Sequence, residues 1–417
     1  MSLSPADYLP AFADFLDASP TSYHAAARAG ARLAEAGYAV WTRGGPAPAS
    51  GYAVRDGAVA AWRTPAGWTP ADGLCVVAGH TDSPGLKLKP DPVLSAPGGY
   101  AQIGVEVYGG PLLATWFDRE LAVAGRAVNA DGVCQLVQTD AIARVPSLAP
   151  HLGGPQFPPD RQQHIQPVLA LLPGLDVLDL VAAQLAWPRE ELVGADLFCV
   201  PVESAQFFGP HGDFLAAARL DNLSSVYAAL AAFLDQRSEG RALSLFVAFD
   251  HEEVGSLTAT GANGPWLGEI VQGIGRGLEL GEDGLAALWA AATCVSADAA
   301  QGFHPNYPEV FDPVCRPVLG GGPVLKANAG QRYVSDGVGA ALWQRACQAA
   351  GVPVQAYVNR NTVSGGGTIG AALAARWGIA VVDVGIPLLS MHSARELCAT
   401  PDPLWLAEAL AAYWAGA

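Results

Sequence analysis

The sequence predicts an α/β protein with a mixed sheet that carries helices on both faces and is interrupted by a β-rich insertion. From residue 221 onward, helical apolar spacing alternates with continuous apolar runs of strand length, as in parallel-rich sheets. Between residues 86 and 210, short β-like runs alternate with Gly/Pro turns. A chain of 417 residues is long enough for two domains. We expect an α/β domain of residues 1–85 and 211–417, and an inserted domain of residues 86–210.

The individual elements follow from these patterns in chain order. Residues 8–36 have helical spacing with a break at 19–22, and β-like runs follow up to residue 82. Turns such as 96–99 separate the short strands of the insertion, and the Pro- and Gly-rich residues 151–166 are typical of an exposed loop. The later helices and strands are predicted at 222–236, 243–249, 335–351, 368–377, 379–384 and 402–414.

Net charge, the N-terminal residues and the cysteines indicate which classes of partner and which compartment to expect. The net charge of −16 disfavours binding to nucleic acid or to an anionic membrane surface, because like charges repel. The N-terminal residues lack the basic and apolar regions of a signal peptide, and no uninterrupted apolar stretch reaches membrane-spanning length. The seven cysteines are odd in number, scattered and without a CxxC pair. We therefore expect reduced cysteines and a cytoplasmic protein.

Two adjacent carboxylates, Glu252 and Glu253, follow the predicted strand 243–249. Burying both would cost several kcal/mol unless a cation compensates their charge. Adjacent residues of an extended chain point in opposite directions, so one glutamate can hold a metal ion while the other faces a substrate. The alternative is a pair of solvated acids at the end of a strand.

Similar groups follow or precede other predicted elements. His80 and Asp82 end the apolar run 74–78, Asp298 follows 292–295 and His392 follows 380–387, whereas Asp221 stands at a helix start. The carboxyl ends of strands in an α/β sheet border its ligand-binding crevice. Imidazoles and carboxylates together suit Zn²⁺, Mn²⁺ or Co²⁺. Taken singly, His80 could be a core histidine and Asp221 a helix N-cap.

Over nearly its whole length, the chain resembles the aspartyl aminopeptidase family of dinuclear zinc peptidases. The resemblance rests on several ordered motifs, at residues 79–82, 105–110, 115–119, 326–328 and 391–396. It implies a zinc exopeptidase-like fold and two divalent ions, zinc with cobalt or manganese as possible substitutes. It also implies that Asp221 bridges the ions, that His80 and Asp298 complete one site, and that Glu253 and His392 complete the other. A cis peptide bond at Asp221–Asn222 is implied as well.

The resemblance further implies the roles of residues that are not metal ligands. Glu252 is expected to be the general base. Asp82 stands two residues after His80, and carboxylates commonly accept the free imidazole N–H of a metal-bound histidine, so we assign it this role. Lys326 and Tyr333 match family positions that meet the substrate, and a lysine there would pair with an N-terminal Asp or Glu. His151 matches a family position on an insertion loop that reaches an active site, sometimes in a neighbouring subunit.

Three departures from the family pattern affect the expected specificity. Gln301 stands where members often have histidine, and Thr362 and Gly365 stand where they usually have Asp and Cys. Gln301 can donate a hydrogen bond but carries no charge, so a broad-specificity aminopeptidase remains an alternative to one that prefers Asp and Glu.

The resemblance implies a closed homo-oligomer, a dodecamer built from dimers, that acts on peptides. The apolar and aromatic residues of 105–110 and 115–117 suit the core of such an interface. Two other functions stay open: a deacylase or carboxypeptidase on the same dinuclear scaffold, and a non-enzymatic assembly subunit. The latter would be expected to lack Glu252 or a ligand, and none is missing.

Overall fold

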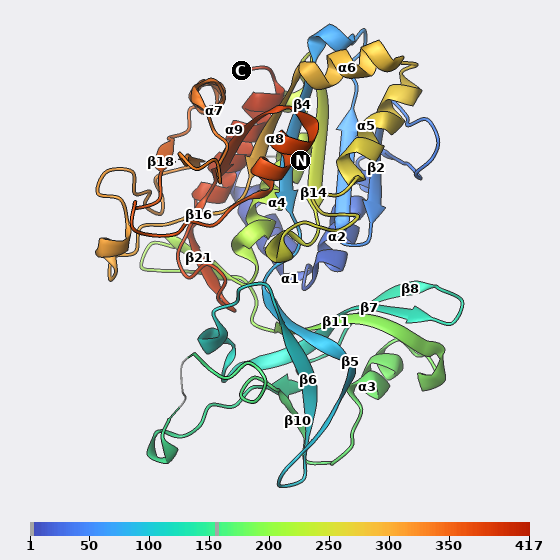
Figure 1. Cartoon of the computed structure of the whole chain (residues 1–417), viewed down its shortest axis with the longest axis vertical. Helices are drawn as coiled ribbons and strands as arrows, with labels where there is room; N and C mark the ends of the chain where they lie inside the picture. The colour runs from blue at the N-terminus through green and yellow to red at the C-terminus, as the bar shows by residue number, and fades with distance from the viewer. Residues whose placement is uncertain (1–3, 155–157) are drawn as a thin grey trace.

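A nine-stranded mixed sheet organises the larger part of the computed structural model, which describes residues 4–154 and 158–417 (Figure 1). Its order is β1-β2-β3-β14-β4-β15-β19-β17-β18. The four central strands β14, β4, β15 and β19 are parallel, while β3 and β17 join them antiparallel. The bounds are β1 (Ala39–Val40), β2 (Ser50–Arg55), β3 (Ala58–Arg63), β4 (Leu74–His80), β14 (Leu243–Phe249), β15 (Ala292–Ala297), β17 (Val324–Lys326), β18 (Gln355–Tyr357) and β19 (Ala380–Gly385). The predicted fold class is confirmed.

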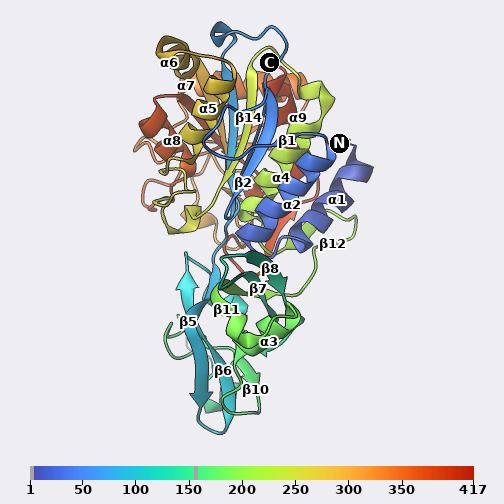
Figure 2. The same ribbon diagram turned by 90° about the vertical axis from the view of Figure 1, so that its right-hand side faces the viewer.

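Helices cover both faces of this sheet, as Figure 2 shows. One face carries α1 (Pro5–Asp17), α2 (Ser22–Glu35), α4 (Leu220–Leu234), α7 (Gly337–Ala350) and α9 (Asp402–Trp414); the other carries α5 (Trp266–Gly277), α6 (Glu282–Ala290) and α8 (Ile369–Trp377). In β4, Val77 packs into the first core, whereas Val76 and Ala78 pack into the second. Because successive strand residues point to opposite faces, a strand covered on both sides has to be continuously apolar.

Two of these helices, α5 and α6, are not among the predicted elements. The sequence of α5 contains four glycines, each of which lowers helix propensity by about 1 kcal/mol. A Cβ at Gly268 would lie 2.1 Å from the Trp377 ring, and one at Gly273 would lie 2.6 Å from the Trp41 ring. These glycines allow close packing, so tertiary contacts and not local propensity stabilise the helix.

A second sheet of seven antiparallel strands lies between residues 85 and 201. Its order is β11-β5-β6-β10-β9-β7-β8, and a further pairing of β11 with β7 closes it. Its interior is filled by apolar side chains, to which the helix α3 contributes. The bounds are β5 (Gly85–Ala96), β6 (Tyr100–Tyr108), β7 (Glu120–Asn129), β8 (Cys134–Gln138), β9 (Ala143–Arg144), β10 (Val168–Ala170), α3 (Val177–Gln184) and β11 (Leu192–Pro201).

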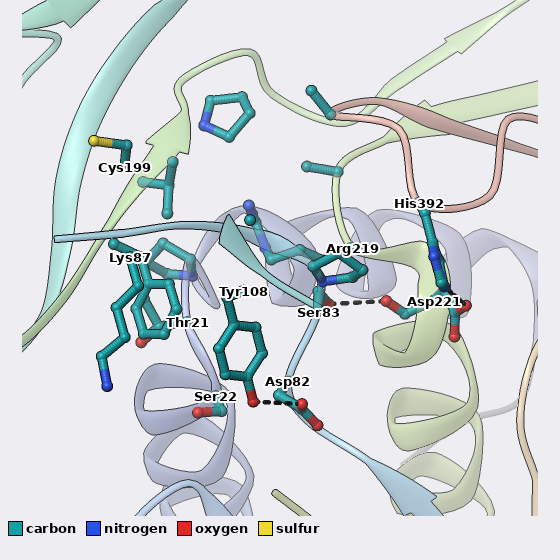
Figure 3. A pocket seen from close by; sticks show the side chains of 18 of the residues that line it. Thr21, Ser22, Asp82, Ser83, Lys87, Tyr108, Cys199, Arg219, Asp221 and His392 are labelled. Atoms are coloured by element: carbon teal, nitrogen blue, oxygen red, sulfur yellow. Dashed lines mark hydrogen bonds and ion pairs between the residues drawn. The ribbon is translucent and has the colours of Figure 1, made fainter. Parts of the chain in front are cut away.

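Part of the apolar content of residues 105–110 and 115–117, predicted to suit an interface core, fills the interior of the closed sheet instead. Val105 and Trp116 are only 1% and 5% exposed and belong to the interior of the closed sheet. A closed sheet has to fill its interior with such side chains, which explains the apolar content of both motifs. Tyr108, at the end of β6, instead points toward the α/β part of the molecule (Figure 3).

The remaining elements are short. Two small sheets contain β12 (Gln206–Phe208), β13 (Phe214–Ala217) and β21 (Glu396–Ala399), and β16 (Ala300–Gln301) with β20 (Pro387–Leu388). The 3-10 helices are η1 (Pro70–Asp72), η2 (Leu113–Trp116), η3 (Pro150–Leu152), η4 (Arg189–Glu191), η5 (Gln236–Ser238), η6 (Glu252–Val254) and η7 (Pro308–Val310). Four of the seven cysteines are buried, whereas Cys134 is exposed. None of the helices in the described residues combines the length and apolarity needed to cross a membrane.

Candidate metal centre

The acidic and imidazole groups predicted from the sequence converge at one edge of the nine-stranded sheet. His80 is the last residue of β4, Asp298 follows β15, and Glu252 and Glu253 lie in η6 shortly after β14. These three strands are parallel neighbours in the sheet. Their carboxyl ends therefore meet, and the groups that follow them share one crevice.

Asp221 lies between two histidines. It comes from the first turn of α4, and His392 comes from the turn between β20 and β21. His80 Nε2 is 3.5 Å from both Asp221 Oδ1 and Asp298 Oδ1. His392 Nε2 is 3.4 Å from Asp221 Oδ2 and 3.5 Å from Glu253 Oε1. Each oxygen of Asp221 thus faces one histidine, and each histidine faces one further carboxylate.

The carboxylate of Asp221 is not used as a helix cap. The Asp221–Asn222 peptide bond is cis, as the resemblance implies, and both residues have non-helical backbone angles. Asp221 Oδ1 is buried and accepts no hydrogen bond from any residue that the structure describes. A buried carboxylate oxygen without a donor is costly, so this oxygen fits a cation.

The whole donor set suits divalent metal ions. Two groups, His80–Asp221–Asp298 and Asp221–Glu253–His392, each offer three ligand atoms that lie within 4.8 Å of one another. Carboxylate oxygen and imidazole nitrogen are the ligands that zinc, cobalt and manganese accept. Burial, and then the charge of Asp221, raises the pKa of Glu253 well above its usual value. Metal ions would compensate these crowded charges, and the residues present fit them.

Both histidines present Nε2 to this centre. The Nδ1 atom of His80 is 3.0 Å from the backbone carbonyl oxygen of Asp82 and 3.4 Å from its Oδ1. The Nδ1 atom of His392 is 3.1 Å from the carbonyl oxygen of Gly110. A carbonyl can only accept, so Nδ1 carries a proton in each ring, which leaves Nε2 as the nitrogen that can bind a cation.

Two buried carboxylates hold the backbone around the centre. Asp82 accepts the N–H groups of Glu252 and Glu253 at 3.0 and 3.1 Å. Glu396, 2% exposed, accepts the N–H groups of Asp221 and His392 at 2.8 and 2.6 Å. Glu396 is not among the predicted site residues, although it ends the motif at 391–396. Its role depends on contacts that only the folded chain makes.

A cavity of about 510 Å³ opens beside the centre. The residues that line it include Glu252, Lys326, Tyr333, Gln301 and Arg360. Burial raises the pKa of Glu252 to about 7; the charge of His80 opposes this shift, and nearby carboxylates such as Asp298 add to it.

Lys326 is more constrained than a flexible surface lysine. Its side chain is 1% exposed, and Nζ donates to the carbonyl oxygens of Asp298 and Ala299 at 2.7 and 3.1 Å. The same atom is 3.7 Å from Asp298 Oδ2 and 5.1 Å from the centre of the Tyr333 ring. An ammonium has three N–H groups, and these two hydrogen bonds use two of them. Gln301 is exposed, and its Nε2 lies 3.1 Å from Met391 Sδ.

His151 is not brought to this centre within one chain. It lies in η3 and is exposed, and the described residues that line the cavity do not include it. A role for His151 at the site would need a second copy of the chain, as the resemblance allows.

Comparison with known proteins places this geometry in a family. The model of the M18 family, described as aminopeptidase I zinc metalloprotease, matches residues 15–414. A probable M18 family aminopeptidase 2 from Streptomyces avermitilis is 43% identical over 96% of each chain. A chain in the cryo-EM structure of the Ape4 and Nbr1 complex is 32% identical with a TM-score of 0.88, over 99% of this chain and 86% of that one. A chain of the S. cerevisiae mApe1 dodecamer is 26% identical with a TM-score of 0.85, over 98% of this chain and 96% of that one.

Proposed function

The chain belongs to the M18 family of aminopeptidase I zinc metalloproteases, and we propose that it releases single N-terminal residues from peptides with two divalent ions bound. The observation that carries the proposal is the position of Asp221 between His80 and His392. In this proposal Asp221 is shared, His80 and Asp298 complete one site, and Glu253 and His392 complete the other. Zinc is the expected metal, and cobalt or manganese can replace it.

The chain's own residues would then move the proton and select the substrate terminus. When bound, the ions supply Lewis acidity at the scissile carbonyl and acidify the attacking water. Glu252, which lines the cavity beside the centre, takes the proton from this water and passes it to the leaving amine as the C–N bond breaks. The free α-amino group of the substrate would bind to one metal ion or to nearby carboxylates of the centre. This contact favours the N-terminal residue over an internal peptide bond.

Activity on aminoacyl substrates tests this proposal most directly. The purified protein should release N-terminal residues from a panel of short peptides, and acetylation of the α-amine should abolish cleavage. Cleavage of acetylated peptides at the same rate would favour a deacylase or endopeptidase and contradict the proposal.

We further propose that the cavity prefers an N-terminal Asp or Glu. Among the described residues, Lys326 and Arg360 are the Lys and Arg side chains that line it, and we expect the third N–H of the buried Lys326 ammonium to meet the substrate carboxylate. Lys326→Met keeps most of the side-chain volume and removes the charge. It should lower kcat/KM for Asp- and Glu-peptides by about tenfold or more relative to neutral ones, the range of a lost charge-assisted hydrogen bond. Rates on matched acidic and neutral substrates measure this ratio.

Lys89→Met, in the insertion strand β5, is the matched control and should leave the ratio unchanged. An equal loss on acidic and neutral substrates would mean that Lys326 only supports Asp298, and that the enzyme has broad specificity.

We also propose a cytoplasmic homo-oligomer, a dodecamer built from dimers through the unit formed by residues 86–210. The support is the similarity to a chain of a dodecamer and the exposed position of His151, which a second copy could bring to the cavity. A closed assembly would enclose the active sites, so peptides would be cleaved and folded proteins spared. Light scattering at working concentration should give a mass close to twelve times 43.0 kDa. A fully active monomer would contradict the assembly.

A further inference from the structure

The end of strand β6 reaches from the closed sheet to the candidate metal centre. We call residues 108–112, which follow and include the last residue of β6, the 108–112 segment. Tyr108 lines a small cavity of about 100 Å³ between the two parts of the molecule and points across it to Asp82, as Figure 3 shows. Asp221 and His392 lie on the far side of the same cavity (Figure 3). The segment therefore lies next to the candidate metal centre, on the side of the closed sheet.

Tyr108 contributes a hydrogen bond to the carboxylate that organises one side of the centre. Its hydroxyl donates to Asp82 Oδ2 at 2.7 Å. The other donors to this carboxylate are the N–H groups of Glu252 and Glu253, and His80 Nδ1 lies 3.4 Å from Oδ1. Asp82 is 4% exposed, so it has little access to water as a substitute donor. A carboxylate held by several donors is fixed in one orientation, and it in turn fixes the positions of the groups that donate to it.

The Tyr108 ring is itself held in place. It packs edge-to-face on Phe198 of β11, with 5.4 Å between the ring centres and 88° between the planes. Such aromatic pairs favour a defined geometry. The insertion sheet thus places the hydroxyl, and the hydroxyl contacts Asp82.

The next residues of the segment contact the other side of the centre. The carbonyl of Gly110 lies 3.1 Å from His392 Nδ1, and the N–H of Leu112 donates to the carbonyl of His392 at 2.8 Å. Gly109 has a φ of +67°, and a Cβ there would lie 3.1 Å from Glu253 Cβ. Glycine at 109 therefore permits a backbone approach that a larger residue would obstruct.

We propose that the 108–112 segment is a positioning element of the catalytic centre, with Tyr108 acting through Asp82 on His80 and Glu252, and Gly110 acting on His392. This inference rests on the proposed function of the centre. Outer partners of this kind fix the tautomer and direction of metal-binding imidazoles. The insertion is then part of the active site within a single chain, in addition to any role in assembly. The two sheets have to dock correctly for the centre to work.

Tyr108→Phe tests the proposal because it removes one hydroxyl and keeps the ring on Phe198. Loss of such an outer contact typically costs about 10–100-fold in metal affinity or activity. We expect kcat to fall by about tenfold with KM little changed, and zinc affinity, measured by competition with a chelator, to fall by a similar factor. Tyr100→Phe, on the same strand but 42% exposed, is the matched control and should behave like the wild type.

The outcomes separate this inference from the proposed function. A wild-type protein without metal-dependent aminopeptidase activity would refute the proposed function itself. An active wild type with unchanged kcat and zinc affinity in Tyr108→Phe would overturn only the positioning role. A loss of activity that merely follows a loss of folded or assembled protein, seen by thermal unfolding and light scattering, would also overturn it. Reduced kcat and zinc affinity in a folded, assembled Tyr108→Phe protein would support it.

Discussion

Glu252→Gln is expected to lower kcat by about 10²–10⁴-fold, the usual contribution of a general base. The substitution keeps the size and shape of the side chain but removes its ability to take a proton from the attacking water. Glu252 lines the cavity, and it is not one of the five residues that we assign as metal ligands. Metal content and oligomeric mass should therefore stay at wild-type values, and kcat measured at saturating metal isolates the proton transfer.

Glu282→Gln, on the exposed first turn of α6, is the control for the same chemical change and should keep full activity. A Glu252→Gln enzyme that retains most of its kcat would show that another group takes the proton. Loss of metal from Glu252→Gln would instead place this carboxylate among the ligands, where its proximity to His80 and Glu253 would allow it.

Asp221→Asn is expected to abolish both metal binding and activity. One carboxylate oxygen faces each histidine, so neutralising this residue weakens both proposed sites at once. The wild-type protein should contain about two ions per chain, chelation should abolish activity, and added zinc, cobalt or manganese should restore it.

His392→Ala should mainly weaken one site, because His392 contacts Asp221 and Glu253 but not the His80–Asp298 pair. Elemental analysis after dialysis measures the number of ions per chain in the wild type and in each variant.

Asp402→Asn is a matched control for Asp221→Asn, because Asp402 is also a buried aspartate in the first turn of a helix. It accepts the N–H groups of Gly320 and Gly322 and is not part of any of the candidate metal groups found in the described residues. Its substitution should leave the metal content unchanged. An active wild type with one ion per chain would contradict the dinuclear proposal.

Elements with a strong local pattern could be predicted closely. Strand β14 has the predicted bounds of 243–249, and α9 has the predicted bounds of 402–414. In β14 every residue is buried between two helical layers, so its apolar run is continuous and easily recognised. Pro403 lies in the first turn of α9, where proline is tolerated and marks a helix start. Such signals are contained in a few neighbouring residues.

Other elements depend on contacts that are remote in sequence. The glycines of α5 disfavour a helix locally, yet they allow Trp377 and Trp41 to pack closely on it. Lys326 resembles a loop lysine in the sequence, but it ends the short strand β17 and is buried. The carbonyl oxygens of Asp298 and Ala299 make this burial possible, because they accept its N–H groups.

The sequence by itself determined the α/β class, the insertion and the groups that the structure brings to one centre, because apolar periodicity and reactive residues at strand ends are local features. Only the tertiary structure decided how those groups are held. Glu396 and Tyr108 act through hydrogen bonds to residues distant in the chain, and Asp221 meets both histidines only when α4 docks against the sheet. The apolar periodicity of the sequence does not predict such contacts, because their geometry depends on how whole helices and strands pack together.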